Sequence, residues 1–228
     1  AIVDVGCDLE SSQASAALAA ADPMVWASVG VHPHEAKHWD DETPHRLREL
    51  SRQERVVAIG EMGLDFHYNH SPPDTQRRVF REQLALAVEL DLPAVLHIRE
   101  AYEESHGILD EQRDPKLRGV AHCFTGNAAQ ATGFVERGFY VSFTGVVTFK
   151  KAKDVQDAAT VVPLDRLLVE TDCPYMSPVP MRGKRCEPAY VVHTARAIAA
   201  LRGVPEAVVF EAVTANAARL FGLSVDAG

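Results

Sequence analysis

The chain has 228 residues, of which 46% are hydrophobic and 24% charged, and its formal net charge at pH 7 is −9. This composition is typical of a soluble globular protein, and the length suffices for one large core. The acidic balance excludes a protein that coats nucleic acid through a broad basic surface, but it is compatible with an enzyme that grips one strand end. The sequence contains no membrane-spanning run and no signal-peptide pattern, so we expect a cytoplasmic protein, a monomer or weak oligomer, that does not contact membranes.

Short apolar runs recur along the chain, rich in β-branched residues or leucine, and each is typical of a buried parallel strand. We expect strands near residues 2–5, 25–31, 56–60, 93–97, 118–122, 139–143 and 166–170. Helical patterns separate most of these runs. Alternating strands and helices indicate an α/β fold with a parallel sheet.

The clearest helical pattern runs from Thr75 to Leu90, where apolar residues repeat at four-residue steps and Asp74 is the expected N-cap. A second pattern begins near Pro188 and stops at Gly203. Two more helical segments are expected to close the chain, near 205–213 and 215–221.

The strand count is seven, one fewer than a closed (β/α)8 barrel needs. We therefore expect a TIM-like (β/α)8 barrel, as a single domain over residues 1–228, whose first strand is missing from this chain. No linker rich in Pro, Gly or Ser divides the sequence. An open seven-stranded sheet is the alternative.

Five of the apolar runs end on a residue that can bind a metal, namely His32, Glu61, His97, His122 and Asp172. The carboxyl ends of parallel strands line one face of the fold, and functional residues gather there. Carboxylates and imidazoles that meet at one barrel mouth are typical of a divalent-metal hydrolase.

Glu61 is expected to bind metal, because a carboxylate at the end of a buried run is costly unless it is paired or metal-bound. His97 and His122 end successive strands, and neighbouring strands lie about 5 Å apart, which suits two ligands of one metal. Asp65 could orient a ligand from behind. Asp65 and Arg99, which both follow ligand candidates closely, are also expected beside the substrate.

Asp172 can ligate a metal and take a proton from the attacking water, so Glu61 and Asp172 are the expected catalytic pair. Loops after the last strands of such barrels often bind phosphate, and Arg182 and Arg185 lie in that place. Their guanidinium groups can hold phosphate with two hydrogen bonds. His32 is expected to bind substrate phosphate, with metal binding as the alternative.

The four cysteines are spread along the chain without a CxxC pair, which favours reduced thiols. Cys123 and Cys173 each follow a candidate ligand directly. A disulfide between these two is the alternative.

With these residues assembled, the chain resembles the TatD family of metal-dependent deoxyribonucleases, within the amidohydrolase-like TIM barrels. The segments that carry the resemblance are VGVHPHEA, GEMGLDFHY, PAVLHIREAYEE, AHCFTG, VSFTGVVTFKKA, LLVETDCPYMSP, RGKRCEP and TANAARLFGL. They cover nearly the whole chain in order.

The resemblance implies that Glu61 bridges two divalent metal ions (Mg, Mn or Zn), that His97 and His122 complete one site, and that Asp172 serves the other site and the attacking water. Arg182 and Arg185 would face phosphate. The implied activity is the removal of nucleotides from the 3′ end of single-stranded DNA, with RNA as an alternative substrate.

The family opens with a strand that ends in His-x-His, and no such pair precedes GCDLESS here. This departure agrees with the count of seven strands. Two other functions stay open at this point: a metal-dependent hydrolase of an amide, ester or lactone on the same barrel, and a non-catalytic binding barrel.

Overall fold

The computed structural model describes residues 1–223. The chain groups into two compact units, Ala1–Val120 and the part from Ala121 on, and the single domain over 1–228 stays a prediction. No helix among the described residues combines the length and the apolar character that a membrane span requires.

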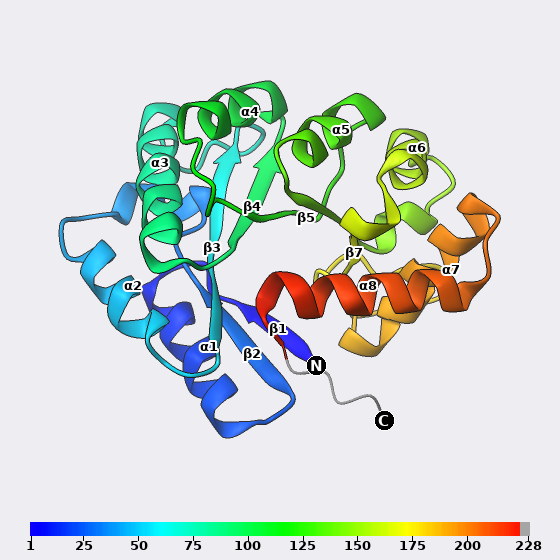
Figure 1. Cartoon of the computed structure of the whole chain (residues 1–228), viewed down its shortest axis with the longest axis horizontal. Helices are drawn as coiled ribbons and strands as arrows, with labels where there is room; N and C mark the ends of the chain where they lie inside the picture. The colour runs from blue at the N-terminus through cyan, green and yellow to red at the C-terminus, as the bar shows by residue number, and fades with distance from the viewer. Residues whose placement is uncertain (224–228) are drawn as a thin grey trace. The chain divides into compact units, whose positions relative to one another are not determined.

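The first unit alternates strands with helices. Its elements are β1 (Ile2–Val5), α1 (Leu9–Ala21), β2 (Val25–Val29), η1 (Pro33–His38), α2 (Thr43–Ser51), β3 (Val56–Asp65), α3 (Pro73–Leu90), β4 (Ala94–Arg99) and α4 (Tyr102–Glu111). The strands pair in the order β1-β2-β3-β4, and all three pairs are parallel. Helix α1 packs against β2, and α3 packs along β3 (Figure 1).

Strand β5 (Gly119–His122) spans the boundary between the units. The second unit continues with α5 (Ala128–Glu136), β6 (Tyr140–Phe143), η2 (Gly145–Thr148), α6 (Lys153–Val161), η3 (Leu164–Arg166), β7 (Leu167–Val169), η4 (Pro188–Tyr190), α7 (Val191–Arg202) and α8 (Glu206–Phe221). Strands β6 and β7 are parallel neighbours. Helices α7 and α8 pack on each other, in orange and red in Figure 1.

In the described part of the chain the seven strands follow sequence order, from β1 to β7. Each of them lies at a position that the apolar runs predict. The α/β class and the seven strands, one fewer than a closed (β/α)8 barrel requires, are therefore confirmed.

Three predicted details are wrong. The strand expected near residues 56–60 continues to Asp65, so the whole GEMGLD motif lies within β3. The two expected closing helices form the single helix α8, since neither Gly nor Pro interrupts residues 206–221. Asp74 lies in the first turn of α3 and not at its N-cap, because Pro73 already occupies the first helical position, where proline is favoured.

The core of each unit explains why its strands are fixed in place. All ten residues of β3 are buried, among them the fully buried Ile59, Met62 and Leu64. In the second unit, the Phe124 ring meets the Phe134 and Phe143 rings edge to face. Such packing holds the strand ends, and the polar residues on them, in defined positions.

Candidate functional site

The polar residues of the first unit gather around β3 and β4. Gly60 and Gly63 on β3 have φ values of +139° and +142°, which residues with a side chain rarely adopt. A Cβ atom on Gly63 would lie 2.1 Å from the carbonyl oxygen of His97. The glycine thus allows β3 to approach β4 at the point where the two strands carry Glu61 and His97.

Glu61 lies between two imidazoles. Its Oε1 atom is 2.8 Å from Nδ1 of His97 and 3.5 Å from Nε2 of His32, and the side chains of Glu61 and His32 are 10% and 12% exposed. One ligand atom from each of the three residues lies within 4.8 Å of the other two. The Cys7 thiol lies 3.6 Å from the second carboxylate oxygen, Oε2.

The donor set fits a divalent metal ion. Two imidazole nitrogens and one carboxylate oxygen that converge in a largely buried place are the ligands that Zn, Mn and similar ions take in proteins. His32, Glu61 and His97 would hold such an ion. We refer to these three residues as the first-unit cluster.

Asp65 lies behind the first-unit cluster and is completely buried. Its Oδ2 atom is 3.1 Å from Nε2 of His97 and 2.9 Å from Nε2 of His34. Its Oδ1 atom accepts hydrogen bonds from the backbone N–H groups of His67 and Tyr68. This arrangement orients the His97 ring, as a carboxylate does behind a metal-bound histidine.

Burial opposes the ionisation of Asp65. The hydrogen bonds from His97, from the Tyr68 N–H and from His34 outweigh this effect and hold the pKa of the carboxyl well below its usual range. Asp65 is therefore an ionised acceptor near neutral pH. Its burial favours the orienting role over direct contact with a substrate.

Arg99 ends β4 and lies opposite Asp65 in the strand register. Its guanidinium carbon is 4.7 Å from the centre of the Tyr68 ring. The expected substrate-binding role of Arg99 is compatible with this partly exposed place.

In the second unit, His122 at the end of β5 meets Glu170, which follows β7 directly. Nδ1 of His122 is 3.1 Å from Oε1 of Glu170. Glu170 also accepts hydrogen bonds from the backbone N–H of Cys123 and from the Ser142 hydroxyl. Glu170 thus orients His122 through one ring nitrogen, as Asp65 orients His97.

Asp172 lies in the loop after β7, and its carbonyl oxygen accepts a hydrogen bond from the backbone N–H of Tyr175. The side chains of Arg182 and Arg185 are exposed in the following loop. The Arg182 guanidinium carbon lies 4.4 Å from the centre of the Phe149 ring. No disulfide joins the four cysteines, all of which lie within residues 1–223.

The structure thus brings together two of the four expected metal ligands, Glu61 and His97, and adds His32, which was expected beside the substrate. The other two, His122 and Asp172, belong to the second unit. The roles of all these residues stay predictions.

Sequence reasoning missed one residue that orients a histidine from behind, namely Glu170, which contacts His122. Glu170 could have been found, because it ends the apolar run LLVE in the same way that Glu61 ends VVAIG. His34, which the HPH motif makes a candidate for phosphate or metal binding, contacts Asp65 instead of joining the first-unit cluster.

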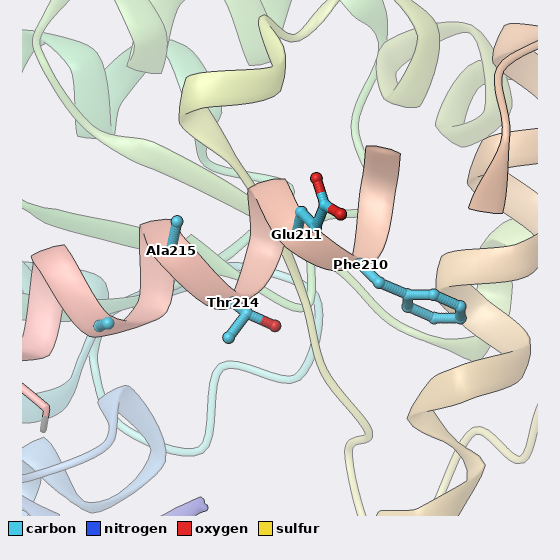
Figure 2. A pocket seen from close by; sticks show the side chains of 5 residues that line it. Phe210, Glu211, Thr214 and Ala215 are labelled. Atoms are coloured by element: carbon cyan, nitrogen blue, oxygen red, sulfur yellow. The ribbon is translucent and has the colours of Figure 1, made fainter. Parts of the chain in front are cut away.

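A cavity of about 420 Å³ lies along α8 in the second unit. Figure 2 shows its lining, which consists of Phe210, Glu211, Thr214, Ala215 and Ala218. This lining holds one carboxylate and no imidazole. It therefore lacks the donor set of a metal centre.

Comparison with known proteins shows the fold and the family of this chain. The family model described as "TatD related DNase" matches residues 1–222. The uncharacterized metal-dependent hydrolase YabD of Bacillus subtilis (strain 168) is 43% identical over 223 residues, which are 98% of this chain and 88% of YabD. The 3′-5′ ssDNA/RNA exonuclease TatD of Cronobacter sakazakii is 41% identical over 221 residues, which are 95% of this chain and 84% of that protein.

Among solved structures, YjjV, a TatD homolog from Escherichia coli K12, superposes with a TM-score of 0.92 at 29% sequence identity, covering 98% of this chain and 86% of YjjV. This agreement confirms the predicted fold class, a TIM-like barrel with one strand fewer in this chain. The matches to the family model and to these relatives span nearly all of the sequence and include the residues of the first-unit cluster. The chain therefore belongs to the TatD family of metal-dependent hydrolases.

Proposed function

We propose that this protein is a metal-dependent phosphodiester hydrolase that removes nucleotides from the 3′ end of single-stranded DNA or RNA. The observation that carries the proposal is the first-unit cluster, in which one buried carboxylate lies between two imidazoles. The name of the Cronobacter sakazakii relative, a 3′-5′ ssDNA/RNA exonuclease, supports the choice of substrate.

In the first unit, His32, Glu61 and His97 would hold a divalent ion. Glu61 would also be a ligand of a second divalent ion. When bound, such ions act as Lewis acids on phosphoryl oxygens and make water acidic enough to react near neutral pH. Asp65 would keep His97 in one orientation, so that Nδ1 points toward Glu61.

In the second unit, Asp172 would take the proton of the water that attacks phosphorus. His122, held by Glu170 through one ring nitrogen, would offer its other ring nitrogen as a metal ligand. Arg182 and Arg185 would bind phosphate oxygens and stabilise the negative charge that develops on them.

The overall charge fits an enzyme that holds one strand end. With a net charge of −9, the protein as a whole repels a polyanion. Binding would therefore depend on local cations and weaken as salt is added.

The test uses one single-stranded oligonucleotide in two versions, labelled at the 5′ end or at the 3′ end, with Mg²⁺ or Mn²⁺ present. The 5′-labelled strand should give a ladder of shortening products, while the 3′-labelled strand should release its label as a mononucleotide at once. EDTA should stop both reactions. Release of a mononucleotide from the 5′ end would contradict the polarity, and two intact strands would contradict the nuclease activity.

A further inference from the structure

A group of exposed rings lies beside the first-unit cluster and is not part of it. It consists of His67, Tyr68 and His70, in the segment between β3 and α3. Tyr68 is 51% exposed, so its ring is open to a ligand. We refer to Tyr68, His70 and Arg99 as the ring platform.

The rings of the platform are ordered with respect to one another. The Tyr68 and His70 rings are parallel to within 3° with centres 5.6 Å apart, the geometry of an offset stack. The His67 ring meets Tyr68 edge-on at 4.6 Å. The Arg99 guanidinium lies over the Tyr68 ring.

The platform is also tied to the first-unit cluster. The backbone N–H of Tyr68 donates to Oδ1 of Asp65 at 2.9 Å. The other oxygen of Asp65 contacts His97. The His34 ring, which also contacts Asp65, meets His70 edge-on at 4.6 Å. Asp65 therefore fixes the place of Tyr68 relative to Glu61 and His97.

The charges around the platform suit a nucleic-acid strand. Lys37 donates through Nζ to the carbonyl oxygen of His70 at 3.2 Å, and Arg99 adds a second cation. Glu100, the acidic neighbour, is paired with His67 at 2.8 Å. Flat rings with cations beside them are how proteins hold single strands without regard to sequence, because every base has a face that can stack.

We propose that Tyr68, together with His70 and Arg99, receives a nucleobase near the 3′ end of the strand and so places the scissile phosphate at the first-unit cluster. The proposal rests on the proposed function and adds a binding determinant to it. Tyr68 binds and positions the substrate in this account. It takes no part in the proton transfers.

The kinetic test compares wild type, Tyr68→Ala, Tyr68→Phe and, as matched control, Leu18→Ala, an exposed apolar residue on α1. Each protein digests a normal single strand and one that lacks the bases of its last two nucleotides. Tyr68→Ala should raise KM for the normal strand about tenfold, which corresponds to about 1.4 kcal/mol and lies within the range of base stacking, with kcat changed less than about threefold. Tyr68→Phe keeps the stacking ring and should recover most of the affinity that Tyr68→Ala loses, whereas Leu18→Ala, away from the platform, should resemble wild type.

The base-free strand separates stacking from a purely structural effect. Wild type should bind it about as weakly as Tyr68→Ala binds the normal strand, and Tyr68→Ala should suffer no further loss on it, since the lost contact is the same. If the Tyr68→Ala substitution and the removal of the bases each weaken binding and their effects add, the proposal is overturned. It is also overturned if Tyr68→Ala leaves KM unchanged.

A binding measurement distinguishes failure of the platform from failure of the nuclease activity. Fluorescence anisotropy of a labelled single strand in EDTA reports binding without cleavage. If wild type binds the strand and Tyr68→Ala binds it more weakly, the proposed role of the platform is supported, even if neither protein cleaves the strand. Equal binding by the two proteins, or none by wild type, overturns it.

Discussion

Two carboxylates on one strand have different tasks because their surroundings differ. Glu61 faces the imidazoles of His32 and His97 and has the place of a metal ligand. Asp65 contacts two imidazole nitrogens and accepts hydrogen bonds from two backbone N–H groups. It therefore has the position of a residue that orients a ligand. His97 lies between the two, with one ring nitrogen on each.

Because Asp65 orients His97, we expect metal affinity to fall when Asp65 is replaced. Asp65→Asn keeps the size of the side chain but removes the negative charge that holds His97, so the affinity for Mn²⁺ should fall about 10- to 100-fold. Isothermal titration calorimetry measures this affinity. The matched control is Asp91→Asn, because Asp91 is exposed on the same unit and pairs with Arg118 on the surface, away from the first-unit cluster. If both variants bind Mn²⁺ like wild type, Asp65 does not orient a ligand.

Asp172 provides a second prediction at this scale. Asp172→Asn should lower kcat on single-stranded DNA about 10²- to 10⁴-fold, because an amide cannot take a proton from water. The circular-dichroism spectrum and the melting temperature should stay those of wild type. Asp165→Asn, an exposed change in the same unit, is the control and should retain activity. An Asp172→Asn variant that turns over substrate as fast as wild type would refute the assignment.

At the scale of elements, the approach of β3 to β4 depends on Gly63. The space that a side chain would need there is taken by the backbone of His97. Strand pairing and the geometry of the first-unit cluster are thus linked through one residue without a Cβ atom.

Gly63→Ala should therefore lower the free energy of unfolding by at least about 2 kcal/mol, from the strained φ and the backbone overlap together. Urea denaturation measures the change. The control is Gly107→Ala within α4, where a Cβ would meet nothing within 4 Å and where alanine should stabilise by about 0.5–1 kcal/mol. Equal stability of the two variants would show that β3 and β4 have room to separate.

The elements themselves could be predicted from the sequence, because apolar runs and buried strands coincide. The extent of β3 could not. The two glycines in GEMGLD indicate a turn when read alone, whereas the register of β3 on β4 keeps them in a strand. Likewise, the HPH spacing does not reveal that His32 joins Glu61 and His97, since only the packing of η1 on β3 brings it there.

At the scale of the whole molecule, metal binding and folding should be coupled. The ligands of the first-unit cluster come from η1's N-cap, β3 and β4, so the ion binds the folded chain and not the unfolded one. An ion at 100 times its dissociation constant adds about 2.7 kcal/mol of stability. For a chain of this size the melting temperature should rise by about 5 to 10 °C. Calorimetry with Mn²⁺ and with EDTA checks this, and identical melting curves would contradict it.

The most direct measurement of the central claim is the rate at which wild type and Glu61→Gln shorten a 5′-labelled single-stranded DNA in Mn²⁺. We predict a ladder of products for wild type, and its loss both in EDTA and in Glu61→Gln, because the amide removes the charge between His32 and His97. A Glu61→Gln variant that degrades the strand as fast as wild type would contradict the account.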